Sequence, residues 1–311
     1  MKKAVILMNM GGASNIDEIE LFLRNMFADK HILPMNKYLR AFIGNMIVKS
    51  RLDEVKENFQ KYLNGKSPLL EITESLAEKL EKRTGILSVP IMRYVPPFAT
   101  PTLQKLKSKK IDELILFPMY PQYSTTTTLS SIEDIKESCK EIGYNPKIRV
   151  IKPYYDNYNY IKLIAQKIIE TMKGKDISKY DLILSAHGLP LSIIKNGDPY
   201  EKQIEANLSA LKIYLYHQGI IFNEIKLAYQ SKVGKAKWLE PNLTDILRNP
   251  TNKKVVIYPL SFTIDNSETL FELDIEHREI ATKIGYDDYI VVKCFNDDSR
   301  FVELIEELIE C

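Results

Sequence analysis

Two stretches that are far apart in the sequence carry residues capable of chemistry. His187 stands at the end of an apolar run that begins at Asp181, and Glu268 follows a second apolar run that includes Tyr258. Such runs are typical of buried parallel strands, and ligands bind at the carboxyl ends of strands in open α/β sheets. An imidazole that faces a carboxylate can exchange protons or hold a divalent metal. We therefore expect His187 and Glu268 to meet at one site.

The context of His187 favours a chemical role over a structural one. A single histidine after a strand is more often a structural residue, but Gly188 and Pro190 keep the following backbone in a turn. A serine hydrolase would need a nucleophile elbow, G-x-S-x-G, and the sequence contains none. His187 is therefore interpreted as a base or a metal ligand.

Three glutamates follow the second apolar run at four-residue spacing. Glu268, Glu272 and Glu276 fall on one face of a predicted helix. A solvated acidic face is the ordinary interpretation, although like charges at this spacing mildly destabilise a helix. The alternative is a row of carboxylates that passes hydrated divalent cations inward, with Glu268 deepest.

Other predicted strand ends also carry groups suited to a ligand. Tyr120–Thr128 offers rings and hydroxyls, although a capped helix start explains part of it. Met92–Tyr94 ends a strand with a cation and a ring, and Tyr229–Trp238 adds three lysines and the only tryptophan. Together these strand ends predict a large pocket for an aromatic anion. The Gly11–Gly12 turn is a tight turn or an anion cradle.

Composition excludes several classes of function. The 311 residues are 45% hydrophobic and 27% charged, and the formal charge of +2 gives no case for nucleic acid. Cys139, Cys294 and Cys311 have no metal-ligand spacing and fit a reducing cytosol. The apolar start is too short for a signal peptide, and no stretch has the roughly 20 apolar residues of a membrane span. We expect a cytoplasmic protein.

Hydrophobic patterning predicts two rounds of strand–helix alternation, hence two Rossmann-like doubly wound domains, each with a four-stranded parallel sheet flanked by helices. We expect an N-terminal domain over 1–153, a C-terminal domain over 154–298 and a last helix over 299–311. Residues 33–83 interrupt the first round with three helix-like segments and no strand. Within them the amphipathic residues 38–48, flanked by basic residues, predict either a helical hairpin on the core or an apolar lip. Such a lip, over 33–50, covers a flat ligand or touches a membrane surface.

The sequence resembles the ferrochelatase family, enzymes that insert ferrous iron into a porphyrin. Short motifs that follow one another in the family's order cover nearly the whole chain. They are Leu7–Gly12, Gly65–Pro68, Met92–Tyr94, Tyr120–Ser124, Ser185–Pro190, Gly197–Tyr200, Tyr229–Gly234, Trp238–Leu239 and Ser267–Asp274. The resemblance implies the chelatase fold, with the helices of 33–83 as the lips of a porphyrin cleft and the last helix packed on the first domain.

The resemblance also implies roles for single residues. His187 takes protons from the pyrrole nitrogens and contacts the metal, Glu268 is its acidic partner, and Glu272 and Glu276 line an outer route for metal or protons. The positions that match porphyrin-binding residues are Met10, Arg51, Ser67, Arg93, Tyr94, Tyr120, Tyr123 and Trp238. Of these, Arg51 and Ser67 match positions that hold propionates, and Met10 lies on the porphyrin face opposite His187.

The chain departs from the family pattern at a few positions. Asn266 stands where many relatives have a second histidine, and Tyr229 where some have tryptophan. Gly188 replaces a common serine, which we interpret as neutral. Thr125 replaces a cysteine that binds an iron–sulfur cluster in animal enzymes, and no cysteine-bearing tail follows Cys311, so no such cluster is expected.

By resemblance, the expected reaction is insertion of Fe²⁺ into protoporphyrin IX, the last step of haem biosynthesis, without a cofactor. Met10 favours protoporphyrin, because many relatives that use coproporphyrin have tyrosine there. The alternatives are a chelatase for coproporphyrin or another tetrapyrrole, and a non-catalytic haem or porphyrin carrier. A carrier would need the aromatic pocket but neither the acidic row nor His187. Oligomeric state is not readable from the sequence.

Overall fold

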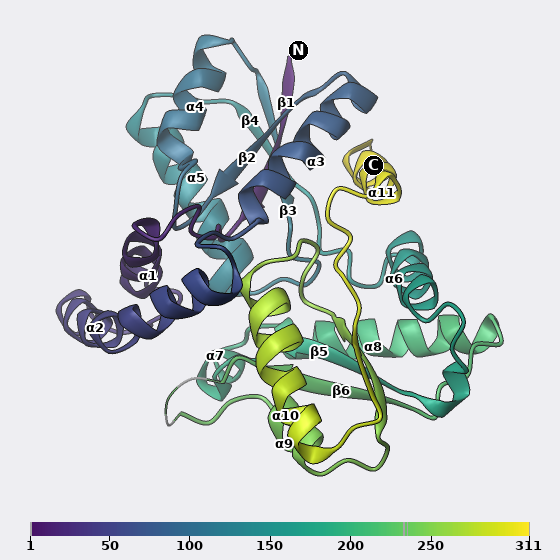
Figure 1. Ribbon diagram of the computed structural model, residues 1–311. Helices are drawn as coiled ribbons and strands as arrows, with labels where there is room; N and C mark the ends of the chain where they lie inside the picture. Colours follow the sequence, from purple (N-terminus) through teal and green to yellow (C-terminus); the bar gives the residue numbers. More distant parts are fainter. Residues whose placement is uncertain (1, 233, 235, 311) are drawn as a thin grey trace. The chain divides into compact units, whose positions relative to one another are not determined.

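The structure is a computed structural model that describes residues 2–232, 234 and 236–310. Two positions of the predicted ligand wall, Val233 and Lys235, and the cysteine at 311 lie outside the described residues. The chain divides into two compact units (Figure 1). Unit 1 comprises Met1–Tyr120, Ser124–Lys152 and Asn296–Cys311, and unit 2 comprises Pro121–Tyr123 and Pro153–Phe295.

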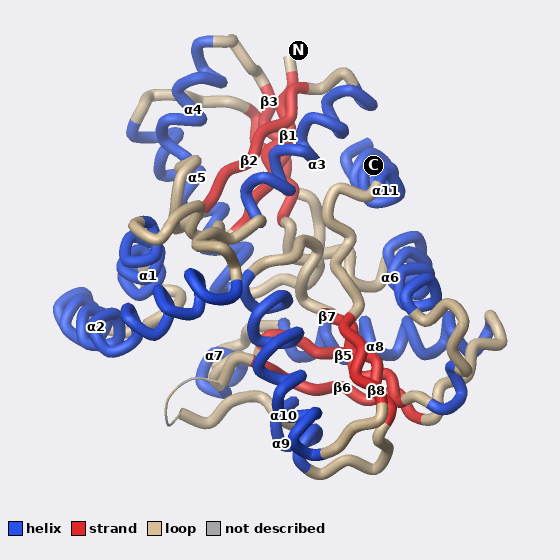
Figure 2. Tube along the Cα trace, viewed as in Figure 1, coloured by secondary structure: helices blue, strands red, loops and turns tan. Residues whose placement is uncertain are grey.

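Unit 1 contains a four-stranded parallel sheet with the strand order β2-β1-β3-β4. Its strands are β1 (Lys3–Asn9), β2 (Leu87–Met92), β3 (Glu113–Pro118) and β4 (Lys147–Val150). Helices α4 (Ala99–Ser108) and α5 (Ser130–Glu141) pack on one face, and α3 (Leu69–Thr84) lies on the other side (Figure 2). The central strands are buried on both faces, which is why they read as continuous apolar runs.

Two helices, rather than the predicted three, occupy residues 33–83. Helix α2 (Lys37–Tyr62) runs unbroken for 26 residues and packs against α1 (Glu18–Ala28), and α3 follows it. The predicted break fails because residues 49–62 contain no Gly or Pro, so the helix continues through this polar stretch. None of the described helices is long and apolar enough to cross a membrane.

The last helix belongs to unit 1. Helix α11 (Ser299–Glu310) packs against α3 and buries Phe301 and Ile305 completely. Arg83 of α3 pairs with Glu303 at 3.2 Å and with Glu306 at 2.5 Å. Apolar burial on one side of the helix and ion pairs at its rim therefore hold α11 to α3.

Unit 2 repeats the architecture with the strand order β6-β5-β7-β8, again all parallel. Its strands are β5 (Asp181–His187), β6 (Glu224–Gln230), β7 (Lys254–Pro259) and β8 (Asp288–Val291). Helices α6 (Tyr158–Thr171) and α8 (Tyr200–His217) pack together on one side of the sheet. Helices α9 (Leu243–Arg248) and α10 (His277–Ile284) lie on the other side (Figure 2).

The two sheets share one topology, and it defines where each can bind a ligand. In unit 1, β1 lies between β2 and β3, and in unit 2, β5 lies between β6 and β7. The strand order reverses at β1 and at β5, and ligands of doubly wound sheets bind beyond the carboxyl ends of such strands. The predicted pair of four-stranded, doubly wound parallel sheets is thus confirmed, and His187 is the last residue of β5.

Local helix geometry differs from the sequence expectation. Residues Glu268–Glu276 form a π-helix, η3, where the spacing predicted an α-helix, and Thr125–Leu129 form a shorter one, η1. The short helices η2 (Ile177–Lys179) and α7 (Leu191–Lys195) were not predicted. π-Helical segments are rare and frequently occur at functional sites.

Candidate active site

The backbone of His187 is fixed by two hydroxyl groups. Its N–H donates to Ser261 Oγ at 3.1 Å, and its carbonyl oxygen accepts a hydrogen bond from Tyr200 Oη at 2.9 Å. The two hydroxyl oxygens lie 2.6 Å apart. Because Tyr200 donates its proton to the His187 carbonyl, Ser261 donates to Tyr200. This closed set of hydrogen bonds fixes the point from which the imidazole projects.

Gly188 lies where the ends of β5 and β6 approach each other closely. Its N–H donates to the carbonyl oxygen of Gln230 at 2.9 Å. A Cβ at this position would lie 2.8 Å from that same oxygen and 3.3 Å from the ring of Trp238. A side chain at this position would push against the backbone of β6 and require it to shift. That glycine is neutral here in place of serine stays a prediction.

Glu268 is the first residue of η3, and the side chain of Asn266 binds its backbone. The side-chain oxygen of Asn266 accepts from the Glu268 N–H at 2.8 Å, and its carbonyl oxygen accepts from Leu270 N–H at 3.0 Å. Its amide group donates to the Ile264 carbonyl at 3.3 Å. Asn266, which stands where many relatives have histidine, thus stabilises the turn that positions Glu268.

The structure brings His187 and Glu268 together. His187 Nδ1 lies 2.7 Å from Glu268 Oε2, and the two side chains are 36% and 28% exposed. Both residues belong to unit 2, so the pair is a property of one compact unit. It is half-buried, which keeps both groups reachable while it removes much of the surrounding water.

The contact between His187 and Glu268 shifts the pKa values of the two groups in opposite directions. Burial by itself lowers the pKa of His187, but the negative charge and hydrogen bond of Glu268 outweigh it, so the pKa is raised. Burial by itself raises the pKa of Glu268, but His187 outweighs it, so the pKa is lowered. An ionised carboxylate can only accept, so the His187 proton resides on Nδ1 and Nε2 is the basic nitrogen of the neutral ring.

Glu272 lies beside this pair and is joined to it by Ser231. The Ser231 N–H donates to Glu272 Oε1 at 2.6 Å, and Ser231 Oγ lies 2.5 Å from Glu272 Oε2 and 3.1 Å from Glu268 Oε2. Gln230 Nε2 donates to Glu272 Oε2 at 3.3 Å. Burial and the nearby Glu268 charge raise the pKa of Glu272. The two carboxylates therefore differ in acidity although they lie side by side.

The third glutamate stands at the end of the π-helix. Glu276 is exposed, whereas Glu268 and Glu272 are partly buried, so the row ends in an exposed carboxylate. After Glu276 comes His277, which is buried and donates from Nδ1 to the Glu272 carbonyl at 2.7 Å. His277 Nε2 accepts from Thr244 Oγ1 at 3.2 Å, which ties η3 to α9. Within the described residues, His187 and Glu268 form a pair and no set of three or more His, Cys, Asp or Glu is grouped for a metal.

In unit 1, a buried carboxylate organises the predicted porphyrin-binding residues Arg93 and Tyr94. Asp29 is 5% exposed and accepts from Tyr94 Oη at 2.9 Å and from the hydroxyl of Ser130. The Arg93 guanidinium lies 3.3 Å from Asp29 and 3.4 Å from Asp134, and its Nε donates to Ser130. Arg93 is therefore held in one place from three sides.

Tyr94 has no exposed surface in this structure. It is 0% exposed, its ring packs edge-on against Phe22 with centroids 6.0 Å apart, and its hydroxyl is bonded to Asp29. Its side chain therefore supports Asp29 and offers no surface to a ligand here. Met10 lies next to it and is half-buried, and its carbonyl oxygen accepts from the Tyr94 N–H at 3.0 Å.

The other predicted porphyrin-binding residues lie on separate elements. Ser67 is buried, and a Cβ on Gly12 would lie 2.5 Å from its hydroxyl oxygen, so the Gly11–Gly12 turn packs tightly against it. Four others have partly exposed side chains: Arg51 in α2, Tyr120 directly after β3, and Tyr123 and Trp238 in unit 2. Trp238 pairs with Pro190 in an isolated β-bridge, which places it beside the turn that follows His187.

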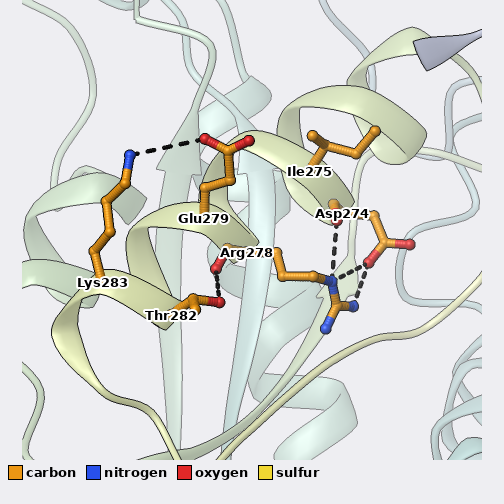
Figure 3. Close-up of a pocket in the computed structure, with 6 residues that line it drawn as sticks. All are labelled: Asp274, Ile275, Arg278, Glu279, Thr282 and Lys283. Atoms are coloured by element: carbon orange, nitrogen blue, oxygen red, sulfur yellow. Dashed lines mark hydrogen bonds and ion pairs between the residues drawn. The ribbon is translucent and has the colours of Figure 1, made fainter. Parts of the chain in front are cut away.

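A hollow of about 310 Å³ lies elsewhere on unit 2 and contains none of the predicted site residues. It is lined by Asp274, Ile275, Arg278, Glu279, Thr282 and Lys283 (Figure 3). Its charged groups pair with one another, Arg278 with Asp274 and Lys283 with Glu279 at 3.8 Å. The hollow is therefore a surface feature of η3 and α10 with internally paired charges.

Two residues of these networks were missed by sequence reasoning. Asp29 follows α1 as an ordinary acidic residue, and nothing in the local sequence indicates that it is buried. Ser231 lies in the Tyr229–Gly234 motif, but its backbone φ of +65° and its two carboxylate contacts depend on β6 and η3 coming together. The motif was the only available signal.

Comparison with known proteins assigns the family. The ferrochelatase family matches residues 2–311. A ferrochelatase from Wolinella succinogenes is 46% identical over 311 residues, covering 99% of this chain and 98% of the relative. One from Sulfurimonas denitrificans is 44% identical over 310 residues, with 99% and 98% covered.

Among solved structures, SirB from Bacillus subtilis with Fe³⁺ matches with a TM-score of 0.60 at 10% identity, covering 99% of this chain and 96% of that one. At this identity the likeness concerns the fold, and it agrees with the chelatase architecture. The family assignment rests on the sequence matches over the whole chain. The chain therefore belongs to the ferrochelatase family and is a lyase-type chelatase that inserts a metal into a porphyrin in haem synthesis.

Proposed function

We propose that this protein inserts Fe²⁺ into protoporphyrin IX to form protohaem, the last step of haem synthesis, without a cofactor or an iron–sulfur cluster. The observation that carries the proposal is the 2.7 Å contact of His187 Nδ1 with Glu268 Oε2, at the carboxyl end of β5. The names of the relatives support iron as the metal.

In this proposal His187 is the base. Metal insertion requires removal of two pyrrole protons, and neutral His187 with its proton on Nδ1 accepts one on Nε2. Glu268 then stabilises the imidazolium across the 2.7 Å contact. The raised pKa of His187 makes it a stronger proton acceptor than an ordinary histidine. After each transfer the proton leaves by exchange with the carboxylates or with solvent.

The same two residues receive the metal substrate at a stage when Nε2 of His187 carries no proton. Imidazole nitrogen and carboxylate oxygen are suitable ligands for ferrous iron, and two protein ligands leave the remaining positions to water and to the porphyrin nitrogens. We place Glu272 and Glu276 on the outer route, because the row ends at the exposed Glu276. The raised pKa of Glu272 suits it to exchange protons nearer neutrality than an ordinary carboxyl group.

Porphyrin binding is assigned to Met10, Arg51, Ser67, Arg93, Tyr120, Tyr123 and Trp238, with Tyr94 acting through Asp29. Support comes from the fixed guanidinium of Arg93 and from the position of Trp238 beside the turn after His187. Met10 favours protoporphyrin over coproporphyrin. A Met10→Tyr variant is expected to shift the ratio of kcat/KM toward coproporphyrin.

We further propose that the start of α2 contacts an anionic membrane surface. Tyr38, Phe42 and Met46 are 87%, 66% and 57% exposed, respectively, and Lys37 and Lys49 flank them. Apolar side chains beside cations match the interface of an anionic bilayer. Co-sedimentation with vesicles containing phosphatidylserine should fall in Phe42→Ser and persist in Tyr216→Ser, which alters an exposed aromatic of α8. Equal binding by both variants and the parent would contradict a membrane contact at α2.

The two free cysteines among the described residues support a cytoplasmic location.

An anaerobic assay tests the reaction. Purified protein is mixed with Fe²⁺ and either protoporphyrin or coproporphyrin, and metallation is followed by absorbance. We expect metallation of protoporphyrin, with a loss of at least about tenfold in His187→Ala and little change in His217→Ala, which alters an exposed histidine of α8. Metallation of coproporphyrin alone would correct the substrate. Tight porphyrin binding without metallation, unchanged in His187→Ala, would favour the carrier.

A further inference from the structure

Ser231 combines an unusual backbone with contacts to two carboxylates. It follows directly after β6, and its φ of +65° lies in the left-handed region that residues other than glycine seldom occupy. Residues in such conformations persist only where the surrounding structure imposes them, and they gather at active sites and ligand clamps. The contacts of Ser231 indicate what this conformation achieves.

The left-handed turn directs both donors of Ser231 at the carboxylates of η3. Its N–H and its hydroxyl reach both oxygens of Glu272, at 2.6 and 2.5 Å, and the hydroxyl also lies 3.1 Å from Glu268 Oε2. Within the described residues, the hydrogen bonds to Glu268 from Ser231 and His187 both fall on Oε2. Glu268 Oε1 is therefore the oxygen that a cation can take without displacing either contact.

We propose that Ser231 is a positioning residue for the divalent metal substrate, which holds Glu272 and Glu268 side by side so that Glu268 presents Oε1 to the metal. This inference rests on the proposed role of His187 and Glu268 as metal ligands. Groups that orient a ligand through hydrogen bonds are known to tune metal affinity by about 10- to 100-fold. Ser231 does not itself touch the metal in this scheme.

The chain offers a substitution that separates the hydroxyl from the backbone. Ser231→Gly keeps the N–H donor to Glu272, and glycine adopts φ +65° without strain. The variant therefore removes the hydroxyl alone. Ser231→Ala also removes the hydroxyl but keeps a Cβ on the left-handed backbone, as serine does. If the hydroxyl acted on stability alone, its loss would lower Tm in Ser231→Ala and leave metal affinity unchanged in both variants. A positioning role predicts a defect in metal binding in both variants.

The experiment titrates Zn²⁺ alone into the full-length protein by calorimetry and then measures steady-state KM values for Fe²⁺ and for porphyrin. For Ser231→Gly we expect the Zn²⁺ Kd and the KM for Fe²⁺ to rise about 10- to 100-fold, with the porphyrin KM within about twofold and Tm unchanged. Ser209→Ala, which removes an exposed helix hydroxyl in α8, serves as the control and should change none of these.

Three outcomes would overturn the inference. Parent-like Zn²⁺ affinity in Ser231→Gly, together with a loss of affinity in His187→Ala, would remove Ser231 from the site and leave the proposed function standing. Equal rises in both KM values would indicate general disruption rather than positioning. If Zn²⁺ binding by the parent does not depend on His187, the metal-ligand proposal fails, and the role of Ser231 fails with it.

Discussion

Gly188 and Gln230 approach each other so closely that a Cβ on Gly188 would lie 2.8 Å from the Gln230 carbonyl oxygen. That oxygen also accepts the Gly188 N–H, and Gln230 precedes Ser231. The residue that follows His187 is thus in contact with the segment that holds Glu272. Backbone contact at Gly188 therefore couples the position of the histidine to that of the carboxylates.

Replacing Gly188 by alanine should displace the end of β6. We expect the free energy of unfolding to fall by about 1–3 kcal/mol, as in other overpacked sites, and kcat/KM to fall about tenfold. Denaturant unfolding and the metallation assay measure the two effects. Gly174→Ala is the control, because it strains a backbone with φ +84° but meets no atom within 4 Å. It should lose stability and keep activity, whereas full activity in Gly188→Ala would refute the coupling.

The activity should depend on pH through His187. Since His187 must be neutral to accept a proton, kcat/KM should decline as pH falls through its raised pKa, which lies above the usual value of about 6.5. In Glu268→Gln the charge that raises the pKa of His187 most is gone and only Glu272 still opposes the effect of burial, so the acid midpoint should move to lower pH. A pH–rate profile in which both proteins share one midpoint would exclude His187 as the titrating base.

The same pair makes stability depend on pH. The raised pKa of His187 adds stability that is complete below its unfolded pKa and is lost as pH rises through the folded value. The lowered pKa of Glu268 adds stability above its unfolded pKa, and this is lost as pH falls through the folded value. We expect the destabilisation caused by His187→Ala, measured by urea unfolding, to be largest between about pH 4.5 and 6.5 and to shrink on either side.

The link between His277 and Thr244 should stabilise the π-helix. Thr244→Val removes the donor to His277 Nε2 and leaves a buried acceptor unpaired, at a cost of about 1–3 kcal/mol. Thr282→Val removes an exposed hydroxyl in α10 and should change stability by less than about 0.5 kcal/mol. Thermal unfolding distinguishes the two, and equal effects would show that the His277 contact adds nothing.

Replacing Asp29 should weaken porphyrin binding more than metal binding. Asp29→Ala leaves the buried Tyr94 hydroxyl without its acceptor and frees the Arg93 guanidinium on one side, so stability should fall by about 1–3 kcal/mol. We expect a higher KM for porphyrin and an unchanged KM for Fe²⁺. Tyr94→Phe keeps Asp29 with Arg93 and should lose less porphyrin affinity. A rise in the metal KM alone would contradict this assignment.

Much of the fold and the core of the site were predictable because they follow from local patterns. Continuous apolar runs predicted the central strands of both sheets, and the end of one such run predicted the position of His187. Glu268 follows β7, which pairs with β5, so the two side chains were expected to meet, and the 2.7 Å contact agrees with this. Periodicity and strand ends suffice for such features.

The remaining features depend on contacts between distant segments. The π-helix and the left-handed backbone of Ser231 arise where β6 and η3 meet, and no residue pattern in either stretch specifies them. The close approach of Gln230 to Gly188 is likewise invisible in the sequence. Tyr94 looked like a ligand contact, and its complete burial depends on Phe22 and Asp29.

The placement of α11 determines the order in which the nascent chain can complete its parts. Most of unit 1 precedes unit 2 in the sequence, yet its α3 packs against α11, which follows unit 2. Unit 2, by contrast, needs only the segments Pro121–Tyr123 and Pro153–Phe295. Domains generally fold as they emerge from the ribosome, N-terminal first. Here unit 1 cannot be completed until α11 has followed unit 2 out of the ribosome, and until then the face of α3 that α11 covers stays exposed to the chaperones of the cell.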